Sequence, residues 1–151
     1  YMRFAREKTE KMTTIKTPFE IGKAQILKEG EDILIIGAGP LVYECLLAAG
    51  LLQERGVHAT VINCHTIKPL DKNTILNAAR KCKRVLTVEE AQVNGGLGGA
   101  IAELLSEELP TKLKRIGVMD RYGESGEPDE LIKKFGLSSE FIFKEAMKLR
   151  G

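Results

Sequence analysis

The sequence lacks the features that would place it in a membrane or on nucleic acid. No apolar run approaches the ~18 residues that a helix needs to cross a bilayer, and the given residues do not have the pattern of a signal peptide. Lysines and arginines are interleaved with aspartates and glutamates at a net charge of +2, so there is no basic stripe for a phosphate backbone. We therefore expect no membrane and no nucleic-acid partner, and a cytoplasmic location.

Clustered metal ligands and nucleophile motifs are missing as well. The cysteines, Cys45, Cys64 and Cys82, are far apart and odd in number, and each lies in an apolar or helical stretch. A zinc site needs clustered Cys and His ligands, and Cys64 beside His65 is the only neighbouring pair. Neither a Ser-His-Asp order nor a P-loop lysine occurs. We predict buried core thiols in a reducing compartment, no metal site and no catalytic residue.

What the sequence does contain is the alternation of an α/β domain. A chain of 151 residues with 43% hydrophobic and 29% charged residues fits a single globular domain. From Asp32 onward, short β-branched apolar runs alternate with segments whose apolar residues recur at helical spacing. The predicted strands are 32–36, 58–63, 84–88 and 113–118, and the predicted helices are 41–55, a segment opened by Pro69 and Asp71, a segment ending at Leu109, 128–135 and 139–149.

This alternation predicts a three-layer α/β/α fold around a mostly parallel sheet of about five strands, with right-handed crossovers. The run 32–36 is apolar on both faces, which is typical of a central parallel strand. Phe19 to Leu27 looks extended and is expected to add an edge strand, with an antiparallel direction as one option.

The N-terminal stretch has a different character. The chain opens on Tyr1 rather than Met and enters directly into an apolar segment, which suggests a piece of something longer. Glu7 to Pro18 is charged and threonine-rich without periodicity, and we interpret it as a linker. Tyr1 to Arg6 would then be the last strand of a preceding domain. The expected division is 1–17 for that strand and linker, and 18–151 for the α/β domain.

A glycine turn follows the first strand of the alternating region. In dinucleotide-binding folds, glycines such as Gly37 and Gly39 let the backbone approach a pyrophosphate at a helix N-terminus. The third glycine of that fingerprint would fall on Val42, and the second strand ends at Asn63 rather than on an acidic residue. A tight strand-to-helix turn needs glycine without any ligand too. Gly37 and Gly39 therefore fit either a ligand edge or a plain turn.

Paired carboxylates, Glu89 and Glu90, stand at the C-terminal end of the third strand and lead into a glycine loop with Gly95, Gly96 and Gly98. Ligands of open α/β sheets bind at this edge. Adjacent residues of a strand point to opposite faces, so the two glutamates are not an acid/base pair of the glycosidase type. One of them could bind a helix N-terminus or a neighbouring subunit. Because glycines let another chain pack closely, we favour an interface over catalysis.

Two further features lie at the same edge. The loop from Asp120 to Pro128, with Glu124 and Ser125, is too long and polar for a minimal turn, and such loops hold function or cover an interface. His65 directly follows the second strand, where it is either a surface histidine or part of the ligand edge. The residues by themselves thus indicate an α/β domain with an active sheet edge and no catalytic machinery of its own.

Several segments together resemble the C-terminal domain of transketolases, in the right order along the whole chain. They are Gly39 to Glu44, Val61 to Asp71, Thr87 to Glu90, Gly95 to Gly98, Arg115 to Val118 and Tyr122 to Gly126. The similarity is closest to split transketolases whose C-terminal half is a separate polypeptide. Deoxyxylulose-phosphate synthase and the beta chain of 2-oxoacid dehydrogenases share this domain, but the Gly-Glu-Ser-Gly loop favours transketolase.

The resemblance implies a role in moving two-carbon ketol units between sugar phosphates, in the pentose phosphate pathway. It also implies that thiamine diphosphate and its Mg²⁺ or Ca²⁺ ion sit between an N-terminal domain and a middle, pyrimidine-binding domain. This chain alone would bind neither and would be inactive. Its partners would be those domains and a second copy in a homodimer, and residues 1–17 would end the pyrimidine-binding domain.

One residue carries a substrate role by resemblance. In the family, an arginine near the end of the middle domain binds the sugar phosphate, and the matching residue here is Arg6. A guanidinium group suits a phosphate dianion, although a surface arginine at a strand end would look the same. Relatives usually have histidine where this chain has Ala91. Besides a transketolase domain, a free-standing nucleotide-binding domain and a non-catalytic interaction module stay open at this point.

Overall fold

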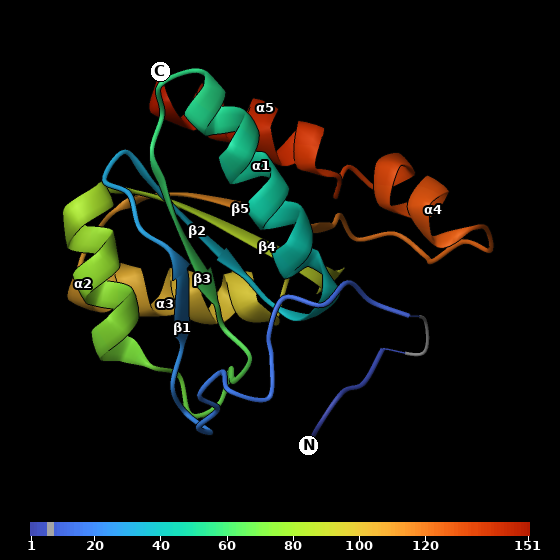
Figure 1. The fold of residues 1–151 in the computed structure, drawn as a ribbon, viewed down its shortest axis with the longest axis horizontal. Helices are drawn as coiled ribbons and strands as arrows, with labels where there is room; N and C mark the ends of the chain where they lie inside the picture. The colour runs from blue at the N-terminus through green and yellow to red at the C-terminus, as the bar shows by residue number, and fades with distance from the viewer. Residues whose placement is uncertain (6–7) are drawn as a thin grey trace.

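A computed structural model describes residues 1–5 and 8–151, which form a three-layer α/β/α fold around a five-stranded sheet (Figure 1). The strands are β1 (Gln25–Lys28), β2 (Ile33–Gly37), β3 (Ala59–Asn63), β4 (Arg84–Gln92) and β5 (Lys112–Val118), and the helices are the 3-10 turn η1 (Gly39–Leu41), α1 (Val42–Glu54), α2 (Lys72–Cys82), α3 (Leu97–Glu108), α4 (Pro128–Lys134) and α5 (Ser139–Arg150). The predicted fold class is confirmed.

The strand order in the sheet is β1-β3-β2-β4-β5. Strands β3, β2, β4 and β5 run parallel, while β1 pairs with β3 in the antiparallel direction. The expected antiparallel edge strand is therefore present. It begins at Gln25 rather than Phe19, because only that part pairs with β3.

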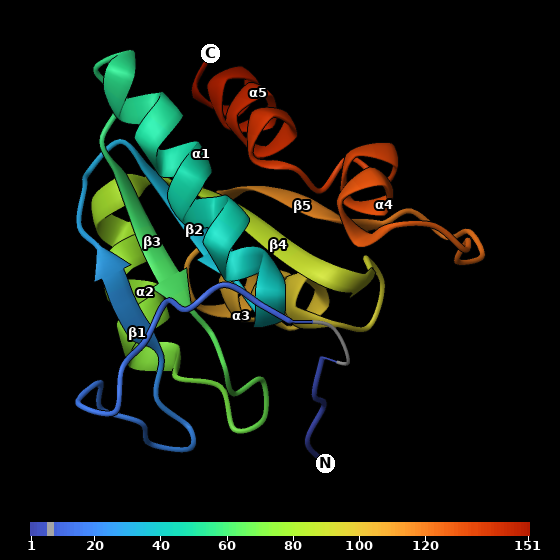
Figure 2. The ribbon, with the colours of Figure 1, turned by 45° about the vertical axis from the view of Figure 1, so that its right-hand side comes forward.

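Strand β2 is fully buried at the centre of the sheet. Ile33 and Ile35 face the core under α1 and α5, whereas Leu34 and Ile36 face the core against α2 and α3. Figures 1 and 2 show these helix pairs on opposite faces of the sheet. A strand covered on both faces needs apolar residues at every position, which explains the continuous apolar run.

Two predicted elements differ from the structure. Strand β4 continues to Gln92 instead of ending at Val88, because after an irregularity Gln92 pairs again with Val118 of β5. Tyr1 to Ala5, the described part of the expected N-terminal strand, is not a strand. A strand needs a neighbour that supplies a ladder of hydrogen bonds, and no such ladder forms on residues 1–5. Arg6 lies outside the described residues.

Asp71 joins the segment before β1 to the start of α2. Its carboxylate accepts hydrogen bonds from the Ala24 N–H (3.0 Å), the Thr74 N–H (3.2 Å) and the Thr74 hydroxyl (2.8 Å). The side chain thus caps α2 and fixes the entry into the edge strand. Burial opposes ionisation, but these hydrogen bonds and nearby Lys23 outweigh it and hold the pKa of Asp71 below its usual value.

The lowered pKa of Asp71 predicts a loss of stability in acid. An acid whose pKa is lower in the folded state stabilises the fold above its unfolded pKa, about 3.9, and this contribution disappears as the pH falls through the folded pKa. We expect Asp71→Asn to be less stable than the unmodified chain at pH 7 and to lose less stability between pH 5 and pH 2. Urea denaturation across this range measures both. A variant with the unmodified pH dependence would exclude this role.

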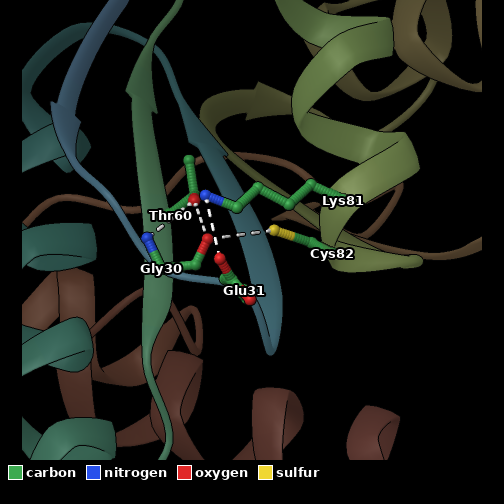
Figure 3. A network of polar contacts seen from close by, with 5 residues as sticks. All are labelled: Gly30, Glu31, Thr60, Lys81 and Cys82. Carbon is green, nitrogen blue, oxygen red and sulfur yellow. Dashed lines mark hydrogen bonds and ion pairs between the residues drawn. The ribbon is translucent and has the colours of Figure 1, made fainter.

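A buried turn at Gly30 lies where the parallel strands begin, at the edge of the sheet opposite to their carboxyl ends (Figure 3). The Thr60 hydroxyl donates to the Gly30 carbonyl (2.7 Å) and accepts from the Gly30 N–H (3.0 Å). The Cys82 thiol also points to the Gly30 carbonyl, at 3.7 Å, and the exposed Lys81 and Glu31 form an ion pair at 3.2 Å. These contacts connect β3, the loop before β2 and the end of α2.

The cysteines lie in the core, as the sequence predicts. Cys45, Cys64 and Cys82 are buried and free. Burial, with a smaller effect of the Asp71 carboxylate, raises the pKa of the Cys64 thiol to about 12, and burial also raises the pKa values of Cys45 and Cys82. Because the thiolate is the reactive form, these side chains act as small apolar residues.

Candidate functional site

The candidate residues gather at the carboxyl edge of the parallel strands. Strands β2, β3, β4 and β5 end at Gly37, Asn63, Gln92 and Val118, and each loop singled out from the sequence starts there. Figures 1 and 2 show the N-terminal segment crossing the same edge. In open α/β sheets this is the edge where ligands and partners bind.

Glu89 organises the glycine loop at this edge. Its side chain is buried, and its carboxylate accepts hydrogen bonds from the Leu97 N–H (2.8 Å) and the Gly98 N–H (2.7 Å). These amides open α3, where the free N–H groups and the helix dipole favour a negative charge. The sequence analysis left open whether one of the glutamates binds a helix N-terminus or a neighbouring subunit. In the structure, Glu89 binds the N-terminus of α3. The position where an α/β domain could hold a phosphate is thus filled by the protein's own carboxylate.

The glycines of the loop make room for contacts within the chain. A Cβ atom at Gly96 would lie 2.0 Å from Glu89 Oε2, and one at Gly98 would lie 2.9 Å from Thr87 Oγ1. Gly95 has φ +82°, a left-handed conformation that favours glycine. At Gly96 and Gly98 the close approach is therefore to side chains of β4 and not to another chain, so the interface interpretation is not needed to explain them.

Glu90 points away from Glu89, as strand alternation requires. It is half-exposed, and its carboxylate lies 3.5 Å from Arg3 Nη2. Arg3 Nη1 also donates to the Glu90 carbonyl at 2.8 Å. Ala91, the next residue, is partly buried. The adjacent carboxylates therefore hold two different segments, the glycine loop and the N-terminal segment.

The first glycine turn has a packing explanation. A Cβ atom at Gly37 would lie 3.0 Å from Cys45 Sγ, so glycine lets α1 pack closely on the end of β2. Gly39 has φ +65° and opens the 3-10 turn. Asn63, at the place of the acidic residue of dinucleotide-binding domains, donates from Nδ2 to Gln25 Oε1 at 3.0 Å. These contacts favour a plain turn over a nucleotide site.

His65 contacts the segment that leads into β1. Its Nε2 lies 3.2 Å from the Glu20 carbonyl, and its ring lies 4.6 Å from that of Phe19, centroid to centroid. The structure thus places His65 against Phe19 and Glu20, where it supports the path of the chain into β1.

The long loop after β5 is attached at both ends. Gln92 donates from Nε2 to the Arg121 carbonyl and accepts from the Asp120 N–H, both at 3.0 Å. Glu124 forms an ion pair with Lys134 of α4, which holds the pKa of the Glu124 carboxyl below its usual value. Ser125, which follows Glu124, is exposed. The loop is a defined surface feature and does not converge on Glu89.

Two contacts that organise this edge could not be predicted from the sequence. The sequence predicts Asp71 only as a helix opener, although its carboxylate also binds the Ala24 amide 47 residues away. The contact between Arg3 and Glu90 spans 87 residues, and the only available signal was opposite charge. Such pairs become visible only once strand order is known.

The described residues offer no group of three or more His, Cys, Asp or Glu side chains that could hold a metal ion. Within that same part of the chain, no helix combines the length and apolar character needed to span a membrane. The first amides of α3 already bind Glu89, so this helix N-terminus is not free for a diphosphate group.

The fold and the contacts at the carboxyl edge of the sheet define the class of protein. It is an α/β domain in which charged side chains at this edge bind other segments of the same chain. Residues 22–142 match the family model for the transketolase C-terminal domain. The chain belongs to this family, as the sequence resemblance indicated.

Three relatives illustrate the match. The chain is 43% identical over 146 residues to a 6-deoxy-6-sulfo-D-fructose transketolase subunit from a Clostridium species, covering 97% of this chain and 45% of that protein. It is 46% identical over 132 residues to 1-deoxy-D-xylulose-5-phosphate synthase from Trichormus variabilis, covering 87% of this chain and 21% of that protein. A solved structure described as a split gene transketolase, inactive beta4 tetramer, has a TM-score of 0.92 at 36% identity over 96% of this chain and 48% of that one. The chain thus spans less than half the length of these relatives.

Proposed function

We propose that this chain is the C-terminal domain of a transketolase that transfers two-carbon ketol units between sugar phosphates, and that it supports assembly without catalysing the reaction itself. The observation that carries the proposal is the family match combined with the occupied α3 N-terminus, where Glu89 takes the place of a ligand. Transketolase-family enzymes depend on thiamine diphosphate, which supplies the carbanion chemistry. The occupied α3 N-terminus, and the lack of a group of three metal ligands among the described residues, support placing that cofactor and its Mg²⁺ or Ca²⁺ ion in other sections of the enzyme.

The alternative activity is that of a deoxyxylulose-phosphate synthase, which has relatives at 46% and 47% identity. Transketolase is favoured because the matched transketolase subunit covers 97% of this chain, including the N-terminal stretch, against 87% for the synthase. The Gly-Glu-Ser-Gly loop at Gly123 to Gly126 supports the same choice by resemblance. We include in the proposal a cytoplasmic location, which the free buried thiols suit, and a place in the pentose phosphate pathway.

The partners we propose are the N-terminal and middle sections of the enzyme and a second copy of this chain in a homodimer. Exposed apolar side chains concentrate in segments at the carboxyl edge and the N-terminus: Tyr1, Met2, Phe4, Phe19, Ile21, Ile67, Met119 and Tyr122. Clusters of this kind usually mark interaction surfaces. Residues 1–17 would be the end of the pyrimidine-binding section and a linker, and residues 18–151 the domain itself.

Reconstitution tests this function. We expect no ketol transfer and no thiamine diphosphate binding by calorimetry for this chain alone, and turnover once the complementary sections are added. In the assembled enzyme, Arg6→Ala should raise KM for phosphorylated sugars at least about tenfold, since charge-assisted hydrogen bonds contribute about 1.5–3 kcal/mol. Micromolar cofactor binding by the chain alone would contradict the assembly role, and an unchanged KM would remove Arg6 from the site.

A further inference from the structure

A cavity with a basic lining lies where the parallel strands begin, at the edge of the sheet opposite to the candidate residues described above. It has a volume of about 300 Å³ and lies between the end of α2 and the connection from α3 to β5. The cations Arg80, Lys83 and Lys112 line it together with Leu109, Pro110 and Thr111, and no carboxylate is part of the lining.

The positive charges of this cavity are not neutralised by neighbouring side chains. Within the part of the chain that the structure describes, Arg80, Lys83 and Lys112 form no ion pair. Lys81, which lies between two of them in sequence, differs because it pairs with Glu31 at 3.2 Å (Figure 3). The unpaired cations are therefore the ones that line the cavity.

The helix ends at this edge offset only part of the charge. Both α2 and α3 end beside the cavity, and a helix C-terminus carries about half a negative charge. Glu107 and Glu108, the last residues of α3, do not line the cavity, and Glu108 lies 3.9 Å from Lys72. With three cations against two helix ends, an excess of about two positive charges remains, which matches a phosphate dianion.

Lys83 occupies a backbone conformation that suits glycine better. It is the C-cap of α2 with φ 59°, in the left-handed region, and its N–H donates to the Ala79 carbonyl at 2.8 Å. Glycine is the usual residue at such a helix end, since a side chain there is strained. Strained residues of this kind occur where the side chain has a function. At Lys83 the strain brings a cation to the cavity.

Two of the cations are oriented by contacts that leave them able to bind an anion. Arg80 donates from Nη1 to Asn77 Oδ1 at 3.1 Å, and Lys112 donates from Nζ to the Leu149 carbonyl at 3.0 Å. Guanidinium and ammonium groups have further N–H donors beyond these. A guanidinium group can also bind two oxygens of one phosphate at once.

We propose that this cavity binds a phosphate group through Arg80 and Lys83, with the charge of Lys112 adding to the attraction. The ligand is either free inorganic phosphate or a small phosphorylated molecule, which present the same dianion. A volume of about 300 Å³ leaves room beside the phosphate for a small carbon body against Leu109 and Pro110. This inference does not depend on the proposed function, because the site lies at the other edge of the sheet.

Titration of the chain with two phosphate probes tests the site. Inorganic phosphate and glycerol phosphate, each added at constant ionic strength, should shift the ¹H–¹⁵N signals of Lys83, Thr111 and Lys112 most, with one common saturation curve. Glycerol without phosphate should shift none of them. Calorimetry then gives Kd for each probe.

Variants identify the side chains that bind. Exposed charge contacts contribute roughly 0.2–1 kcal/mol, a factor of about 1.4–5, so Lys83→Gln should raise Kd about threefold and Arg80→Gln about fivefold. Lys81→Gln is the matched control, because it removes an exposed cation next to the site, and it should change Kd less than about 1.5-fold. Lys83→Gly should raise Kd as Lys83→Gln does without lowering the melting temperature, since glycine suits the left-handed conformation. The weaker binding then has a cause other than unfolding.

The two probes also separate the sources of the phosphate group. Tighter binding of glycerol phosphate than of inorganic phosphate would support a phosphorylated small molecule as the ligand, and equal binding would support free phosphate. Two results would overturn the site. One is the absence of a saturable shift at these amides, and the other is a loss of affinity in Lys81→Gln equal to that in Lys83→Gln, which would indicate unspecific attraction to surface charge.

Discussion

Replacing Glu89 by alanine is expected to lower the free energy of unfolding by about 3–4 kcal/mol. The carboxylate is buried and accepts two short hydrogen bonds from the amides that open α3. Hydrogen bonds to charged groups contribute about 1.5–3 kcal/mol each, and a buried donor left without an acceptor costs about 1–3 kcal/mol. The helix dipole adds to the loss. Glu89→Gln should cost less, about 2 kcal/mol, because its amide oxygen can still accept one bond.

The neighbouring glutamate offers a matched control. Glu90→Gln changes the same residue type one position along β4, but its carboxylate is exposed and makes one ion pair, so we expect a change below about 0.5 kcal/mol. Urea denaturation followed by far-UV circular dichroism measures both variants. A Glu89→Ala variant as stable as Glu90→Gln would show that the glycine loop does not depend on this carboxylate.

Gly30→Ala is expected to destabilise the fold by about 3 kcal/mol or more, the range of core overpacking and buried hydrogen-bond loss. A Cβ atom at this position would lie 2.3 Å from the His58 carbonyl oxygen and 2.6 Å from the Ala59 carbonyl carbon. These are backbone atoms at the start of β3, so the clash cannot be relieved by turning a side chain. Moving the loop away would break the two hydrogen bonds between Gly30 and Thr60 (Figure 3).

Gly50→Ala should change stability in the opposite direction. Gly50 lies within α1, and nothing approaches its missing Cβ within 4 Å. Alanine is favoured over glycine inside a helix by roughly 0.5–1 kcal/mol, so this variant should be slightly more stable. Thermal and urea denaturation of the two glycine variants side by side will show whether the clash with the β3 backbone causes the loss of stability in Gly30→Ala. Equal effects would indicate that Gly30 tolerates a side chain.

Most of the fold could be predicted from local patterns. The apolar run of β2 and the helical spacing in α1 and α5 follow from burial on one or both faces, which leaves a direct trace in the sequence. The length of β4 could not be predicted, since Glu89 to Gln92 belong to the strand only because β5 lies beside them and pairs with Gln92. For the same reason Tyr1 to Ala5 look like a strand in sequence and are not one.

For the candidate site, the sequence indicated the edge of the sheet where the site residues lie, but not the groups that each of these residues contacts. Alternation along β4 predicted that Glu89 and Glu90 face opposite ways, and residue type predicted that one could cap a helix. Which glutamate does so depends on which face of the sheet α3 covers, a property of the strand order and the right-handed crossover.

The α/β class, the family and the edge where the loops gather can be predicted from the amino-acid sequence, because periodicity, glycine turns and local motifs are local features of the chain. The contacts of each charged residue follow from the three-dimensional arrangement alone. Glu89 with the α3 amides, Glu90 with Arg3 and Asp71 with Ala24 join segments that are eight or more residues apart. Such contacts depend on how strands are ordered and helices are packed, and no local pattern specifies that order.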